Sequence, residues 1–164
     1  MTILHQNYPL GIHNSLGFSV AAKFATTITS EDDLRPLFAD QTWQGCPYLT
    51  LGGGSNIVFT QDFPGLVMHI AIRGKRLLKE NTDTWIIEAG AGEIWHDFVS
   101  WTLQQDWPGL ENLALIPGSV GGAPIQNIGA YGVEMAQYCH SVRAYDVHHK
   151  KWVELDTKYC QFNY

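Results

Sequence analysis

Residues 109–132 read GLENLALIPGSVGGAPIQNIGAYG and contain six glycines and two prolines. So many glycines and prolines exclude a continuous helix or strand. The apolar residues between them nevertheless indicate a packed segment, such as an ordered loop shaped around a large planar ligand. The alternative is a turn-rich buried connection that binds nothing.

A second glycine cluster, LGGGSN, occupies residues 51–56 between two predicted strands. Three consecutive glycines, Gly52, Gly53 and Gly54, can adopt backbone conformations that other residues avoid. Their N–H groups can converge on an anion, and the side chains of Ser55 and Asn56 can add hydrogen bonds. We therefore expect a diphosphate site here. The alternative is a tight connection between strands.

The two common nucleotide-binding loops do not fit this cluster. A Walker loop needs a lysine after its last glycine, whereas Ser55 and Asn56 follow here. The dinucleotide fingerprint needs a glycine where Ile57 stands and a helix after it, whereas we predict a strand. The sequence therefore disfavours both standard folds.

Composition restricts the class of ligand. The 164 residues are enough for a real core, and a folded chain of this length buries about 70% of its unfolded surface. The net charge of -6 argues against a nucleic-acid surface, which needs clustered Lys and Arg. An anionic ligand would therefore be held by backbone N–H groups rather than by basic side chains.

Cysteine spacing and hydropathy indicate a cytoplasmic protein without a membrane segment. The three cysteines form no CxxC pair, so we expect reduced thiols. The first residues lack the pattern of a signal peptide, and no apolar stretch is long enough to span a membrane. No spacing predicts a metal site, and we interpret His148 and His149 as part of an exposed hairpin turn rather than as metal or anion ligands.

The pattern of apolar residues predicts a small α/β unit over residues 1–72 and a second unit over residues 73–164, separated by a polar break at 73–76. A capping box formed by Ser30 and Asp33 predicts the start of a short helix. Helices are expected at residues 34–39 and 94–105. Strands are expected at residues 22–29, 47–51, 57–60, 65–72 and 84–89, with a hairpin of 141–147 and 151–155.

Taken together, LGGGSN, the stretch GAGEIWHDFV at residues 90–99 and the segment 109–132 resemble the UDP-N-acetylenolpyruvoylglucosamine reductase family. The resemblance runs from about Asn14 to the last residue, and its longest glycine-rich segment is highly specific. It implies an α+β fold, namely the two-subdomain FAD-binding fold of the vanillyl-alcohol-oxidase type, truncated before the substrate domain. The two predicted units would be its FAD-binding subdomains, the second one incomplete.

The resemblance also implies where FAD binds. Its diphosphate would lie on residues 52–56, in agreement with the anion site expected from the glycines. The adenine and isoalloxazine groups would be lined by residues of the longer segment: Ile116, Pro117, Gly118, Gly121, Gly122, Ile125 and Gly129. Tyr131 and Tyr164 match positions near the substrate, although packing is an equally good interpretation of either aromatic ring.

In this family NADPH reduces the flavin, which then passes a hydride to the enolpyruvyl double bond of a UDP-sugar. The family's catalytic Arg, which follows a Phe-x-Tyr like residues 162–164, and its later Ser and Glu lie beyond Tyr164. We therefore expect no catalytic residue in this chain and no turnover by it alone. We also do not assign Ser119, Glu111 or His96 a role in catalysis. The longer parent protein would be a monomer.

Two other hypotheses remain open at this point. One is an oxidase or dehydrogenase of the same flavin fold, which would often carry a His or Cys for covalent attachment of the flavin. LGGGSN contains neither residue. The other is a flavin- or nucleotide-binding module without chemistry of its own.

Overall fold

The computed structural model describes residues 3–162 and divides the chain into two compact units, Met1–Ile72 and Arg73–Tyr164. Both contain helices and strands, and the α+β class predicted from the sequence is confirmed. Within the described residues, no helix is both long and apolar enough to cross a membrane. Each unit has a hydrophobic core of its own.

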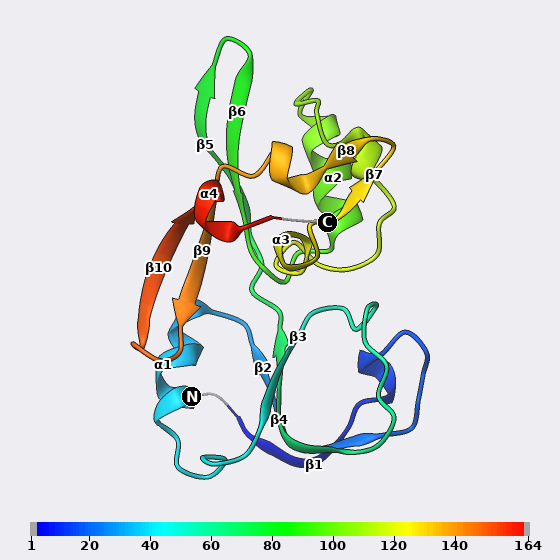
Figure 1. The fold of residues 1–164 in the computed structure, drawn as a ribbon, viewed down its shortest axis with the longest axis vertical. Helices are drawn as coiled ribbons and strands as arrows, with labels where there is room; N and C mark the ends of the chain where they lie inside the picture. The colour runs from blue at the N-terminus through cyan, green and yellow to red at the C-terminus, as the bar shows by residue number, and fades with distance from the viewer. Residues whose placement is uncertain (1–2, 163–164) are drawn as a thin grey trace. The chain divides into compact units, whose positions relative to one another are not determined.

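The first unit is built on a four-stranded mixed sheet with the order β1-β2-β4-β3 (Figure 1). β1 pairs antiparallel with β2, whereas β2 and β3 both run parallel to β4. The strands are β1 (His5–Pro9), β2 (Ala21–Ile28), β3 (Tyr48–Leu51) and β4 (Phe63–Ile70). β4 is apolar and buried along its middle, as expected of a strand with a partner on each side.

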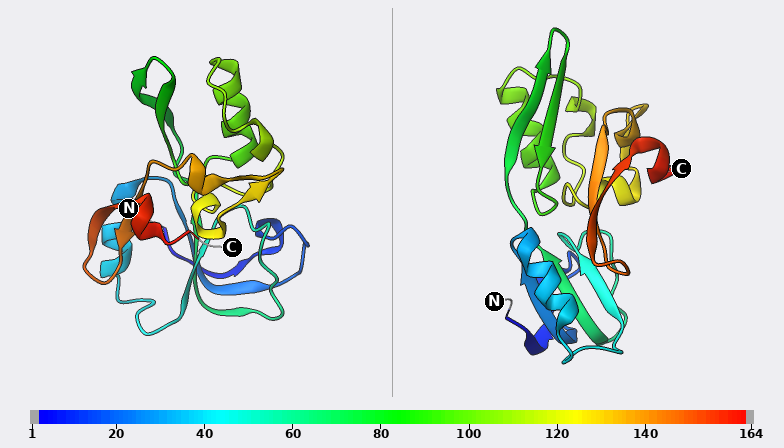
Figure 2. Two further views of the ribbon diagram at one scale, coloured as in Figure 1. Left: turned by 45° about the horizontal axis from the view of Figure 1, so that its top comes forward. Right: turned by 90° about the vertical axis from the view of Figure 1, so that its left-hand side faces the viewer.

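The helical parts of this unit are short: η1 (Gly11–His13), η2 (Glu31–Asp33) and α1 (Leu34–Ala39). The predicted capping box starts the η2–α1 pair, and the Ser30 N–H donates to the Asp33 carboxylate at 2.9 Å. Leu34 and Leu37 are buried, and α1 lies against the sheet in both views (Figure 2). A core of buried residues on the sheet includes Leu10, Leu51 and Val67.

The second unit consists of short antiparallel pairs and helices. Its strands are β5 (Lys75–Asn81), β6 (Thr84–Ala89), β7 (Gly129–Ala130), β8 (Val133–Glu134), β9 (Ser141–Asp146) and β10 (Lys151–Asp156). They pair as β5–β6, β7–β8 and β9–β10. The helices are α2 (Trp95–Gln104), η3 (Glu111–Leu113), α3 (Ala123–Gln126), η4 (Met135–Gln137) and α4 (Thr157–Cys160).

Helix α2 organises the core of the second unit. Trp95, Phe98 and Val99 are buried on one face of the helix, where Leu113 and Ile128 pack against them. The helix is therefore the support on which the glycine-rich segment rests.

The observed elements differ from the predicted ones in three places. Residues 57–60 do not form a strand, because β3 is the edge of the sheet and this segment has no partner strand. Phe59 is buried although its segment makes no strand pairing. The strands β1 and β5 were not predicted, since neither alternates between apolar and polar residues and both are largely exposed. Lys75 and Arg76, assigned to a polar break, are the first two residues of β5.

Candidate functional site

The LGGGSN loop follows the carboxyl end of β3, one of the parallel strands of the first unit. Ligands of parallel sheets commonly bind beyond this end of the strands. Gly54 is buried and has φ +68°, and a Cβ atom at this position would lie 2.0 Å from the carbonyl oxygen of His13. Only glycine fits there, so the loop conformation depends on residue 54.

The backbone N–H groups of residues 53–56 donate no hydrogen bond to any residue that the structure describes. The side chains of Ser55 and Asn56 likewise have no hydrogen-bond partner among residues 3–162. Gly53 and Asn56 are exposed, while Gly52 and Ser55 are half-buried. Such a run of unused donors in a glycine-rich turn can bind an anion, and FAD carries a diphosphate. The loop thus fits that part of the cofactor.

A neighbouring turn, residues 10–18, supports this loop. The buried Asn14 side chain donates to the carbonyl of Leu10 at 2.8 Å and accepts the N–H of Phe18 at 2.9 Å. The Ser15 N–H then donates to the carbonyl of Gly54 at 3.1 Å. Nothing local in the sequence indicates that the Asn14 side chain closes this turn.

A cluster of aromatic side chains lies beside that turn. The rings of His13 and His69 are 4.8 Å apart, and the Tyr8 hydroxyl is 3.2 Å from Nε2 of His13. Desolvation by burial lowers the pKa of His13 from its ordinary value of 6.5. Burial therefore favours the neutral form of His13 next to the backbone contact that shapes the LGGGSN loop.

The second glycine-rich segment is fixed to the chain that leads into α2. The Trp95 N–H donates to the carbonyl of Gly118, and the Val120 N–H donates to the carbonyl of Glu93. The Gly121 N–H donates to the carbonyl of Ala91 at 2.8 Å. Residues 118–121 therefore run along residues 91–95 as an antiparallel pair, although only the Ile94–Ser119 bridge is regular.

Gly121 has no room for a side chain, because a Cβ atom would lie 2.7 Å from the Cβ of Ala91. Gly122 is less restricted; its nearest neighbour would be the Ser119 carbonyl oxygen at 3.4 Å. Gly118 has φ +124°, which favours glycine. The N–H groups of Ile116 and Gly118 donate to no residue within the described range 3–162, so they are available to a ligand.

The remaining predicted FAD contacts lie at different depths. Ile116 is half-buried and packs on the core of the unit, whereas Pro117 and Gly129 are exposed. Ile125 is 82% exposed. Leu115, which the sequence analysis did not select, is 78% exposed at φ +64°, and no sequence signal indicates that conformation.

Tyr131 is 88% exposed and has φ +53°, so its ring makes no core contact. Tyr164, the other residue predicted near the substrate, lies outside the described residues.

The polar residues that we excluded from catalysis have structural contacts. Nδ1 of His96 accepts the Leu115 N–H at 3.3 Å. The Glu111 carboxylate accepts the Gly109 N–H, and backbone hydrogen bonds lower the pKa of this carboxyl group. The Ser119 carbonyl accepts from Gly122 and Ala123 at the start of α3. Each residue thus helps to shape the glycine-rich segment.

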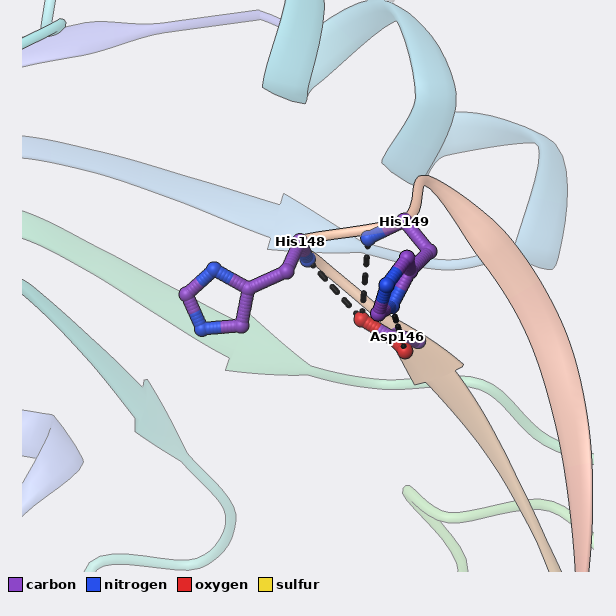
Figure 3. Close-up of polar contacts among 3 residues, drawn as sticks. All are labelled: Asp146, His148 and His149. Carbon is purple, nitrogen blue, oxygen red and sulfur yellow. Dashed lines mark hydrogen bonds and ion pairs between the residues drawn. The ribbon is translucent and has the colours of Figure 1, made fainter.

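His148 and His149 lie in the exposed turn of the β9–β10 hairpin, as predicted (Figure 3). Both backbone N–H groups donate to the Asp146 carboxylate, and the His149 ring lies 2.6 Å from it. These hydrogen bonds lower the pKa of Asp146 from 3.8 to about 2. The hydrogen bond from the His149 backbone is the largest cause. Across residues 3–162, no three His, Cys, Asp or Glu side chains are grouped to hold a metal ion.

Comparison with known proteins agrees with these two glycine-rich sites. A family model described as an FAD binding domain matches residues 22–154, which include both of them. The chain belongs to this FAD-binding domain family. The predicted flavin cofactor class therefore rests on the family as well as on the unused backbone donors of the LGGGSN loop.

Relatives of this FAD-binding domain are named UDP-N-acetylenolpyruvoylglucosamine reductase. The chain is 54% identical to the protein of that name from Paraburkholderia xenovorans over 157 residues, and 51% identical to that from Paraburkholderia phymatum over 158 residues. Each alignment covers 96% of this chain but only 45% and 46% of the relative, respectively. The chain thus spans about half the length of these relatives, and the resemblance seen in the sequence is confirmed.

The fold of this FAD-binding domain resembles that in the crystal structure of UDP-N-acetylenolpyruvylglucosamine reductase from Thermus caldophilus. The TM-score is 0.69 at 24% sequence identity, and the match covers 96% of this chain and 53% of the other. At that identity the likeness establishes the fold alone, and it agrees with the predicted FAD-binding fold class.

Proposed function

We propose that this chain is the FAD-binding part of an NADPH-dependent reductase that converts UDP-N-acetylglucosamine enolpyruvate to UDP-N-acetylmuramate in peptidoglycan synthesis. The observation that carries this proposal is the run of unused N–H donors at residues 53–56. It occurs in a chain 54% identical to a protein named for this reductase. An acidic chain without a basic cluster needs such donors to hold a diphosphate.

The two glycine-rich segments would have different tasks. Residues 52–56 would hold the FAD diphosphate through their N–H groups and through the side chains of Ser55 and Asn56. The adenine and the isoalloxazine ring would rest on Ile116, Pro117, Gly118, Gly121, Gly122, Ile125 and Gly129. The free N–H groups of Ile116 and Gly118 could bind polar edges of the ring system, while the exposed Ile125 would cover apolar surface.

When bound, FAD would supply the hydride chemistry, taking a hydride from NADPH and giving it to the enolpyruvyl double bond. The residues of this chain would bind and orient the flavin and exclude water from it. Tyr131 and Tyr164 would lie near the UDP-sugar. Because the chain spans 45% of its relatives, we assign proton transfer and charge stabilisation to residues outside positions 1–164. The complete protein would act as a cytoplasmic monomer.

FAD titration tests the binding part of the proposal. Purified chain should bind FAD, and Gly53→Val should weaken binding at least about tenfold, or about 1.4 kcal/mol, by crowding the approach of the diphosphate. Gly11→Val is a matched control, because a Cβ atom there meets nothing closer than 3.8 Å. Circular dichroism should show the same fold for both variants. Equal FAD affinity of the parent and a folded Gly53→Val variant would contradict the diphosphate assignment.

NADPH oxidation tests the second part. With FAD and the enolpyruvyl UDP-sugar present, the 164-residue chain should oxidise no NADPH in step with the sugar, whereas the complete protein should. Coupled consumption of both substrates by the chain alone would contradict our assignment of the catalytic groups. The FAD assignment would survive that result.

A further inference from the structure

Two of the three cysteines lie at one end of the β9–β10 hairpin. Cys139 lies two residues before β9, and Cys160 is the last residue of α4, the helix that follows β10. Ser141 and Asp156 face each other as the last pair in the register of the two strands. Figures 1 and 2 both show α4 at this end of the hairpin, and α4 contacts both strands.

Contacts of the two thiols hold them at this pair of facing residues. The Cys139 Sγ donates to the carbonyl oxygen of Ser141 at 3.8 Å, and the Cys160 Sγ donates to that of Asp156 at 3.7 Å. Opposite residues of an antiparallel pair have Cα atoms about 4.5–5.5 Å apart. The two sulfur atoms are therefore anchored to neighbouring backbone groups on opposite strands.

The pKa of Cys139 reflects its surroundings. Burial raises the pKa of Cys139, and the negative charge of the Cys160 thiolate form raises it further. Cys139 is therefore mostly protonated at neutral pH, and it attacks a mixed disulfide through its ionised fraction. The Cys160 contact is the more exposed of the two.

We propose that Cys139 and Cys160 form a reversible dithiol–disulfide pair that reacts with low-molecular-weight disulfides such as oxidised glutathione. The Cys160 thiolate attacks one sulfur of the disulfide, a mixed disulfide forms and the first glutathione thiolate leaves. The Cys139 thiolate then attacks the Cys160 sulfur and displaces the second glutathione thiolate. The protein pair loses two electrons, glutathione disulfide gains them, and the two thiol protons pass to the released thiolates.

The bond would fasten α4 to the segment before β9 and close a loop of about 20 residues, which restricts the unfolded chain. This proposal is independent of FAD binding. Cys46 provides the internal control, because it lies in the first unit, where the Lys23 Nζ is 3.9 Å from its sulfur.

The test is to treat the chain with oxidised glutathione, count its free thiols and map its peptides by mass spectrometry. We expect two of the three thiols to disappear and a peptide linked through Cys139 and Cys160, with the unmodified mass restored by dithiothreitol. Cys46→Ser should lose its two remaining thiols in the same way. Cys139→Ser should instead hold glutathione stably at Cys160.

Three results would overturn the proposal. They are a link that includes Cys46, a disulfide only between separate chains, and an unchanged thiol count in the folded Cys46→Ser variant. Because Cys46→Ser leaves both reacting residues intact, the test does not depend on how well the Cys139→Ser variant folds.

Discussion

Gly54 and His13 are in backbone contact: a Cβ atom at residue 54 would lie 2.0 Å from the His13 carbonyl oxygen. Gly54→Ala should therefore lower the free energy of unfolding by more than the cost of its φ of +68° alone, which is about 1–2 kcal/mol. Gly17→Ala is the matched control, since Gly17 has φ +65° and nothing within 4 Å of its Cβ position. Urea unfolding measures both. Equal decreases in the free energy of unfolding for the two variants would show that the contact with His13 is unimportant.

The adjacent glycines of the second segment should respond differently to the same substitution. Gly121→Ala forces a Cβ atom to within 2.7 Å of the Ala91 side chain, whereas Gly122→Ala places its nearest contact at 3.4 Å. We expect overpacking to cost about 1–3 kcal/mol at residue 121 and clearly less at residue 122. Thermal unfolding of the two variants checks the order, and a reversed order would refute the pairing of residues 118–121 with 91–95.

Glu93 is a buried acceptor close to two cations. Its carboxylate accepts the Gly74 N–H at 2.7 Å and lies 3.7 Å from Arg73 and 3.6 Å from Lys75. Glu93→Gln should lower the free energy of unfolding by about 1.5–3 kcal/mol, because it weakens a charged hydrogen bond in a buried place. Glu88→Gln, at the exposed Arg76 pair, should change the free energy of unfolding much less, because solvent screens that pair. Equal changes in the free energy of unfolding for the two variants, measured in urea, would contradict the larger contribution of Glu93.

His13 should make the first unit less stable in acid. Burial holds the folded pKa of this imidazole below 6.5, so the unfolded chain binds more protons as the pH falls through that value. The contribution to stability is complete above about pH 6.5 and is lost as the pH falls toward the folded pKa. His13→Gln should flatten the pH dependence of the urea midpoint in this window. An unchanged slope would assign the pH dependence to groups other than His13.

Asp146 should titrate far below an ordinary aspartate. Its folded pKa of about 2 lies below 3.8, so its contribution to stability is present above pH 3.8 and is lost as the pH falls toward 2. Because the backbone N–H groups of His149 and His148 stay in place, His149→Ala should raise the pKa of Asp146 only part of the way toward 3.8. Carboxyl NMR can follow the titration. A return of the pKa to 3.8 in this variant would instead assign the effect to the imidazole ring.

Local signals predicted several elements well. The bounds expected for α1 and β6 are the observed ones, because a capping box starts the first and the second is rich in β-branched and aromatic residues. By contrast, β1 and β5 exist through pairing with β2 and β6, and their own residues are largely exposed. Strands that depend on a partner rather than on burial leave no periodic signal in the sequence.

The candidate site could be predicted by segment but not by residue. Glycine density located both loops, yet it could not distinguish Gly54 from Gly53, or Gly121 from Gly122. Those differences come from His13 and Ala91, which are far away along the chain. The left-handed conformation of Leu115 is a further case, since leucine has no preference for it.

The hydrogen bonds that tie residues 118–121 to residues 91–95 have a consequence for selectivity. They fix the backbone of this surface before any ligand arrives, so a ligand that matches it loses little affinity to the ordering of a loop. A flat molecule of another outline would gain no such advantage, because the crowded Gly121 leaves this backbone little room to adapt. The rigidity of the segment thus makes binding selective for ligands of matching shape.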